Sequence, residues 1–310
     1  SNSLDKLSQH ERDRIFVSVT GTLPVEKCSE IQNLALRNMT IGIAPHSTTW
    51  PRHGPQTQPV FQPQISTETG HVVGMNVRGI TLATSGENTS LRSRYLEQGS
   101  NICYSTINML HLDSAISALV EWDRAGLKIP TISLRISEGD LRNPALVGRI
   151  STILEIHHIL PNRLRIEVQD TVIGSAFGTA RADQLLALKT LGCAWVMECQ
   201  NPDSVMISAI EHFGIRHLKI GPKFVTNLDH NFDQHRRFSA LLTAADKLGL
   251  STIAEGVRTA GEHTVLAQLG CGTVQGDGIA KPLCQSQVPT WCRDHLLKLP
   301  KPPPIRQNPG

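Results

Sequence analysis

Short apolar runs with a period of two alternate with longer amphipathic segments through most of the chain. The runs at 60–66 and 72–80 flank the turn signal TETG and predict a β-hairpin. Six helical segments follow, and each leads into a further strand-like run; the helices are expected at 104–125, 144–158, 180–190, 203–213, 235–248 and 260–269. The runs after them are TISLRIS, RLRIEV, CAWVME, RHLKI, STIAEG and GTVQG. Eight strands alternating with helices predict an α/β fold, a (β/α)8 TIM-like barrel.

The pattern divides the chain into three parts. Residues 1–56 are expected to form an N-terminal appendage and linker, because 14–45 read as a small βαβ-like unit and the segment after them is polar and rich in proline. Residues 57–295 hold the barrel. The remaining 296–310 form a Pro-rich tail, expected to be an extended spacer.

Composition and charge restrict the possible partners. The 310 residues are 39% hydrophobic and 18% charged, which suffices for one large domain with extra pieces. A net charge of +3 is too mild to indicate a nucleic-acid partner. No apolar run reaches the ~18 residues that a membrane span needs, so no membrane insertion is expected. Because the chain starts SNSLDK without a Met, we expect a fragment of a longer protein.

The cysteines indicate a reducing compartment. There are seven, an odd number, and no two form a CxxC pair. This usage predicts free thiols in the cytoplasm rather than a disulfide framework or a zinc site.

The residues that could bind a ligand or take part in a reaction lie near the ends of the predicted strands. Five strings occur there in one order: QPQIS from Gln62, IEVQD from Ile166, LKIG from Leu218, AEGV from Ala254 and QGDGIAKPL from Gln275. Catalytic groups of such barrels sit at the carboxyl ends of the strands. Together, over roughly 59–285, the strings resemble the EAL domain, a bacterial family that hydrolyses the second messenger cyclic di-GMP.

The resemblance implies a fold and a site. In EAL barrels the first strand runs antiparallel to the others, and a pair of divalent metal ions drives phosphodiester cleavage. The matching catalytic positions here are Glu167, Lys219 and Glu255, and the positions near the nucleotide are Gln62 and Gln275.

The metal positions match the family only in part. The resemblance implies Glu167 and Glu198 as remnant ligands. Four other family positions are substituted; they are Asn76, Arg135, Cys199 and Gly221. A guanidinium cannot ligate a metal ion and repels one, so Arg135 is the most damaging change. We expect Arg135 to pair with Glu167 on the neighbouring strand, the alternative being that it points to solvent.

The second strand loses a further family residue. The Arg that would hold substrate phosphate is replaced by Ile80. Arg78 lies nearby but out of register, and an ordinary surface or barrel-rim role is expected for it.

Two functions follow from this partial match. The first is a catalytically degenerate EAL-like regulator in a cytoplasmic bacterial signalling protein, acting through a regulatory partner protein or by sensing cyclic di-GMP. The joint loss of phosphate and metal contacts favours the partner protein. The second is a weak phosphodiesterase that gives pGpG. No cofactor is expected, and Mg²⁺ or Mn²⁺ would be needed only if activity remains. Family members often form homodimers, although the altered loop after the fifth strand weakens that expectation here.

Overall fold

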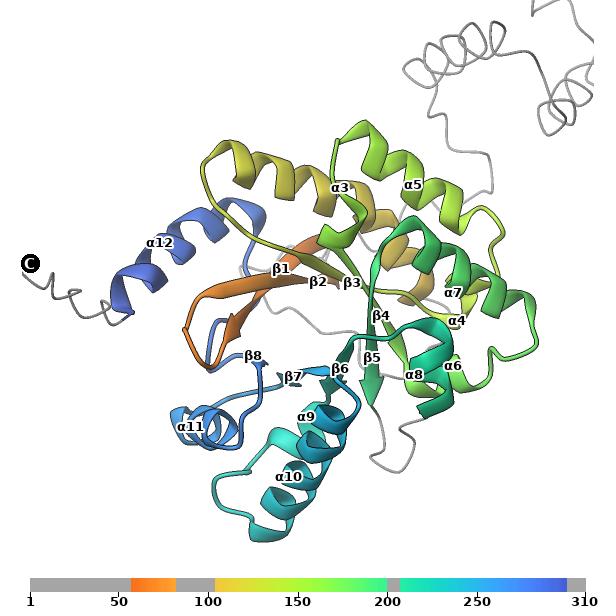
Figure 1. Ribbon diagram of the computed structural model, residues 1–310. Helices are drawn as coiled ribbons and strands as arrows, with labels where there is room; N and C mark the ends of the chain where they lie inside the picture. The colour runs from red at the N-terminus through yellow and green to blue at the C-terminus, as the bar shows by residue number, and fades with distance from the viewer. Residues whose placement is uncertain (1–56, 82–103, 200–206, 300–310) are drawn as a thin grey trace, which may run out of the picture. The chain divides into compact units, whose positions relative to one another are not determined.

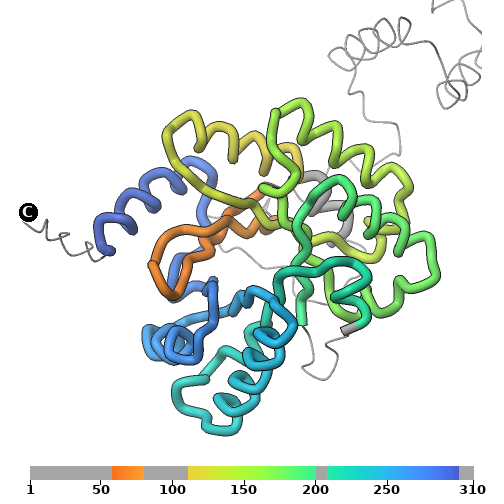
Figure 2. Tube along the Cα trace, in the orientation of Figure 1, coloured from red at the N-terminus to blue at the C-terminus, as the bar shows by residue number. Residues whose placement is uncertain are grey.

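The computed structural model describes residues 57–81, 104–199 and 207–299. Within these ranges eight strands close into a barrel in chain order. They are β1 (Thr57–Ser66), β2 (Val72–Thr81), β3 (Ile132–Arg135), β4 (Leu164–Gln169), β5 (Ala194–Cys199), β6 (His217–Ile220), β7 (Ser251–Glu255) and β8 (Thr273–Gln275). Figure 2 shows the chain following this order around the ring. The predicted α/β barrel is therefore confirmed; the predicted appendage at 1–56 lies outside the described residues.

Helices surround the strands on the outside of the barrel (Figure 1). The longer ones are α3 (Tyr104–Arg124), α5 (Leu146–Ile156), α7 (Ala180–Leu191), α8 (Ile207–Phe213), α10 (Phe232–Lys247), α11 (Ala260–Gln268) and α12 (Val288–Lys298). Short helical turns follow several strands or connect elements. These are α4 (Glu138–Leu141), η1 (Pro161–Arg163), α6 (Asp170–Gly174), α9 (Pro222–Val225) and η3 (Gln285–Gln287).

The first strand is antiparallel to both of its neighbours in the barrel. β1 pairs antiparallel with β2 and with β8, whereas every other neighbouring pair is parallel. The expected hairpin is present: the amide of Gly70, which has φ +71°, donates to the carbonyl of Ser66 at 2.9 Å. The reversed first strand agrees with the expectation drawn from the family resemblance.

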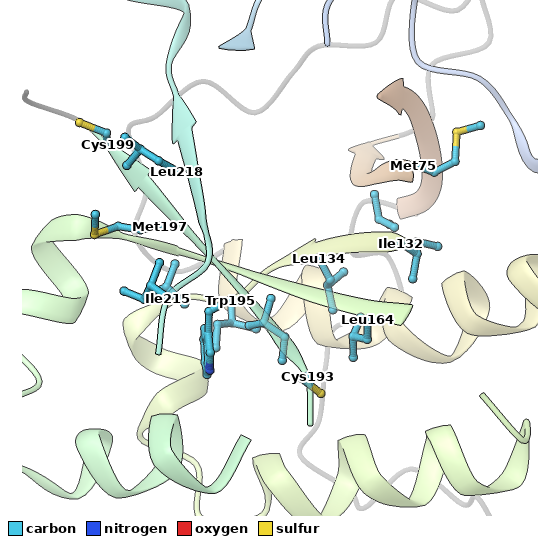
Figure 3. Close-up of a cluster of buried hydrophobic side chains, with 14 of the residues drawn as sticks. Met75, Ile132, Leu134, Leu164, Cys193, Trp195, Met197, Cys199, Ile215 and Leu218 are labelled. Carbon is cyan, nitrogen blue, oxygen red and sulfur yellow. The ribbon is translucent and has the colours of Figure 1, made fainter. Parts of the chain in front are cut away.

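The two faces of the barrel strands differ in polarity. On β4, Leu164, Ile166 and Val168 are buried and belong to the hydrophobic core. Figure 3 shows part of this core, including Leu134, Leu164 and Trp195. Because side chains alternate along a strand, Glu167 belongs to the opposite face. That inner face carries the polar residues that form the site.

No helix in the ranges given above is long and apolar enough to cross a membrane. The cysteines that the structure describes are free thiols, namely Cys193, Cys199, Cys271, Cys284 and Cys292. Cys28 and Cys103 lie outside the described residues.

Candidate functional site

The inner face of the barrel gathers charged side chains from six strands. They are Arg78 on β2, Arg135 on β3, Glu167 on β4, Glu198 on β5, Lys219 on β6 and Glu255 on β7. β2 to β7 are parallel, so their carboxyl ends meet at one end of the barrel. The sequence positions therefore converge because each lies near the same end of its strand.

Lys219 lies at the centre of this cluster and is 2% exposed. Its Nζ donates to Glu167 Oε2 at 2.8 Å and lies 3.4 Å from Glu255 Oε2 and 4.0 Å from Glu198 Oε1. Burial by itself would lower the pKa of Lys219, but the attraction of these carboxylates outweighs burial and raises that pKa above its ordinary value. The three predicted catalytic residues, Glu167, Lys219 and Glu255, are thus brought together as one buried ionic group.

Arg135 pairs with Glu198, so the expected pairing with Glu167 is wrong. Its Nε lies 2.8 Å and its Nη2 2.5 Å from Glu198 Oε1. Glu167 is the strand neighbour of Arg135 in register, but its two oxygens already accept from Lys219 and Asn76. The long arginine side chain reaches past that neighbour to the next strand. The alternative, an Arg135 that points only to solvent, is wrong as well.

Glu198 is buried beside two cations, and its side chain is 4% exposed. Burial raises the pKa of Glu198 above its ordinary value, and the attraction of Arg135 and Lys219 opposes that rise. For Arg135, burial would lower the pKa, but the carboxylates of Glu198, Glu255 and Glu167 raise it above its ordinary value. The guanidinium therefore stays charged.

Arg78 belongs to the site, which corrects the expectation of an ordinary surface or rim role. Its Nη2 donates to Glu255 Oε1, and its Nε donates to Asn76 Oδ1 at 3.3 Å. Burial would raise the pKa of Glu255, but Lys219, Arg78 and Arg135 lower it to about 2. The sequence does carry a signal for this placement. Arg78 is two residues from Asn76, and because side chains alternate along a strand, both lie on the inner face of β2.

Amide side chains join this ionic group to the first and last strands. Asn76 Nδ2 donates to Glu167 Oε1 at 3.0 Å, and Asn76 Oδ1 accepts from Gln275 Nε2 at 3.2 Å. Gln275 also donates to Gln62 Oε1 at 3.0 Å and accepts from Gln64 Nε2 at 2.9 Å. A carboxylate at position 76 would face the carboxylate of Glu167; the amide donates to it instead.

The predicted nucleotide positions, Gln62 and Gln275, are adjacent and buried. Gln62 Nε2 donates to Asp277 Oδ1 at 3.1 Å and to the carbonyl of Ala280 at 3.0 Å. Gln64 and Asp277 are two members of this network that sequence reasoning did not assign. A nucleotide role for Gln62 and Gln275 stays a prediction.

The other substituted positions follow β5 and β6. Cys199 ends β5 and is buried. Gly221 precedes Pro222 and is the N-cap of α9, where its carbonyl accepts from the amide of Phe224 at 3.1 Å. Among the residues that the structure describes, a Cβ at Gly221 would meet the carbonyl of Cys199, at an ordinary contact distance of 3.9 Å, and nothing closer. Steric crowding therefore does not explain why this chain has glycine there.

The family resemblance implies two divalent metal ions, and the side chains present do not fit them. Such ions need several oxygen ligands that converge from different strands. In this cluster the carboxylates of Glu167, Glu198 and Glu255 face the cations of Lys219, Arg135 and Arg78. Among the residues that the structure describes, no group of three His, Cys, Asp or Glu side chains is placed to hold a metal. Metal binding by Glu167 and Glu198 stays a prediction that this geometry does not favour.

The cluster contains three carboxyl groups and three cations, so the protein supplies one cation for each carboxyl group. The most exposed side chains of the cluster are those of Arg78 and Arg135, at 28% and 33%, while the side chain of Lys219 is 2% exposed. The two arginines are therefore the members of the cluster that solvent reaches most readily.

Comparison with known proteins identifies relatives that are similar in sequence over part of their length. Oxygen sensor protein DosP of Escherichia coli is 24% identical over 76% of this chain and 29% of its own length. Cyclic di-GMP phosphodiesterase RocR of Pseudomonas aeruginosa is 24% identical over 52% of this chain and 41% of its own length. The chain thus spans less than half of these curated relatives.

A solved structure described as PaMucR phosphodiesterase in a complex with c-di-GMP superposes with a TM-score of 0.64. It is 22% identical and covers 75% of this chain and 94% of that one, so the likeness shows the fold. Residues 52–282 match the EAL domain model. This chain belongs to the EAL domain family.

Proposed function

We propose that this chain is a non-hydrolytic EAL domain that binds cyclic di-GMP without a metal ion and acts as a regulator in cyclic di-GMP signalling. One observation carries the proposal: the three carboxylates of the site are matched by three cations of the protein itself.

The charge balance argues against hydrolysis. Cleaving a phosphodiester through a metal pair needs ions that generate hydroxide from water and neutralise the phosphate. Arg135 stands at a ligand position and holds Glu198, and Lys219 with Asn76 occupies both oxygens of Glu167. A dication entering this site would meet fixed positive charges in a desolvated environment, where repulsion is strong.

The same cations support binding of an anion. Cyclic di-GMP carries two phosphodiester charges, and guanidinium groups recognise phosphate oxygens well. A relative of similar fold has been solved with c-di-GMP, and another relative is named a cyclic di-GMP phosphodiesterase. From the sequence the joint loss of phosphate and metal contacts favoured a partner protein. The part-exposed side chains of Arg78 and Arg135 change that preference to the nucleotide.

The test is calorimetric titration with cyclic di-GMP, once with Mg²⁺ or Mn²⁺ and once with EDTA, followed by chromatography of the recovered nucleotide. We expect equal affinity in both conditions and intact cyclic di-GMP after incubation. Release of pGpG that stops in EDTA would overturn the proposal in favour of a weak phosphodiesterase. Absence of binding by the folded protein would also overturn it, and would make a partner protein the ligand to seek.

A further inference from the structure

Arg78 and Arg135 lie on adjacent strands, beyond the last paired position of the two strands. β2 and β3 are parallel, and Asn76 pairs with Ser133 in register. Two residues further along each strand are Arg78 and Arg135, on the same face of the sheet. The two cations therefore come from adjacent strands and the same inner face of the barrel, each two residues beyond the last paired position. Like charges placed opposite each other are unfavourable unless other groups compensate them.

The positive charges of the two arginines are compensated by carboxylates that lie deeper in the barrel, on two different strands. Glu255 on β7 accepts from Arg78, and Glu198 on β5 accepts from Arg135. Both carboxylates are more deeply placed than their partners, with side chains 13% and 4% exposed. Each guanidinium is therefore held from the interior, while about a third of its side chain remains open to solvent.

This anchoring prepares the arginines for a ligand. A free arginine loses side-chain entropy when it binds a phosphate, and an arginine already held by a carboxylate has lost much of it beforehand. A guanidinium also has five N–H donors, more than the bonds to one carboxylate use. The ammonium group of Lys219 lies within 4.0 Å of both carboxylates. It therefore helps to fix the two groups that in turn bind the arginines.

We propose that Arg78 and Arg135 together bind a phosphodiester group of the cyclic dinucleotide, with Arg135 standing where the family match places a metal ligand. The inference rests on the proposed function, because it names the residues that hold the nucleotide. It assigns a binding role to two arginines that match no phosphate-binding position of the family.

The test measures affinity for cyclic di-GMP in EDTA for three variants. Arg78→Met leaves Glu255 with Lys219 as a partner. Arg135→Met is combined with Glu198→Leu, because a lone Glu198 would be left buried without its main counter-ion. Arg216→Met is the matched control, since Arg216 is exposed and precedes β6 at the opposite end of the barrel.

We expect Arg78→Met and the Arg135→Met/Glu198→Leu pair each to weaken binding by about tenfold or more, the usual effect of losing a charge-assisted hydrogen bond. Arg216→Met should bind like the wild type. Thermal unfolding followed by circular dichroism checks that each variant is folded. Arg78→Lys and Arg135→Lys provide a second series that keeps the charge and removes the planar fork, and we expect a smaller loss from each.

The outcomes separate this inference from the proposed function. If the wild type binds and the folded variants of both arginines bind equally well, the phosphates lie elsewhere and the inference is wrong while the proposed function stands. If the wild type itself does not bind, the proposed function fails and this inference fails with it.

Discussion

Lys219 is the residue on which the site depends, because all three carboxylates lie within 4.0 Å of its ammonium group. A buried charge is tolerated when opposite charges and hydrogen bonds surround it, and removing one member of such a group costs about 3–5 kcal/mol. Glu167, Lys219 and Glu255 therefore hold each other in place, whether or not the site performs chemistry.

Glu255 links this ionic group to folding stability at acid pH. Its pKa of about 2 lies below the ordinary value of 4.5 because Lys219 and Arg78 stabilise its charged form. A carboxylate with a lowered folded-state pKa adds stability above its unfolded pKa and loses that contribution as the pH falls through the folded value. The contribution is on the order of 3 kcal/mol at neutral pH.

Glu255→Gln should therefore be less stable than the wild type at pH 7. The difference should shrink from pH 4.5 downward and be largely gone near pH 2, because the wild-type carboxyl is then protonated too. Urea unfolding of both proteins at a series of pH values measures it. A stability difference that stays constant over this range would show that Glu255 is not held ionised by its neighbours.

At the residue scale the sequence could predict which side chains meet but not how they pair. Glu167, Lys219 and Glu255 each stand near the end of a predicted strand, so their convergence follows from the barrel. The partner of Arg135 could not be predicted, because acidic residues on the next two strands are both within reach of a flexible arginine. The choice of Glu198 depends on Lys219 and Asn76 already binding Glu167.

Among the elements, α11 shows how the loop after β7 is held. Thr259 caps the helix and Glu262 completes a capping box. Glu262 is 1% exposed, and its carboxylate accepts from the amides of Asn227 at 2.8 Å, Arg258 at 2.7 Å and Thr259 at 3.2 Å. One buried side chain thus ties the loop after β7, next to Glu255, to the segment after α9.

Glu262→Ala should lower the free energy of unfolding by about 2–4 kcal/mol, since it leaves three backbone N–H groups without their acceptor. Glu262→Gln keeps one acceptor oxygen and should cost clearly less. Urea unfolding at pH 7 gives both values. Equal stability of the alanine variant and the wild type would mean that this capping network does not hold the loop.

Helices could be predicted from the sequence where the helical pattern of apolar residues extends over several turns. The predicted helices at 180–190 and 260–269 agree with α7 and α11 to within one residue at each end. The helix predicted from 235 begins earlier, at Phe232, because Asn231 accepts from the amide of Gln234 and caps it. The four-residue helices α4 and α9 are too short to show a helical period and were not predicted.

For the whole molecule, chain order and the reversed first strand could be predicted from the alternation and the family resemblance. The electrostatic character of the site could not, because it is the sum of substitutions on different strands. Asn76 removes a negative charge and Arg135 adds a positive one relative to the family pattern, and only the closed barrel brings both beside Glu167 and Glu198.

The central claim is that the protein's own cations stand where metal ions would bind. Titration with Mn²⁺, followed by electron paramagnetic resonance of the free ion, tests it directly. The matched variants are Asn76→Glu combined with Arg135→Asn, which restores the family residues, and Arg216→Asn, which removes an exposed arginine at the other end of the barrel.

We predict that the wild type and Arg216→Asn bind Mn²⁺ only weakly and that the double variant binds it at least about tenfold more tightly, because one negative charge beside the ion has been added and one positive charge removed. Tight binding of Mn²⁺ by the wild type, or no gain in the double variant, would contradict the account.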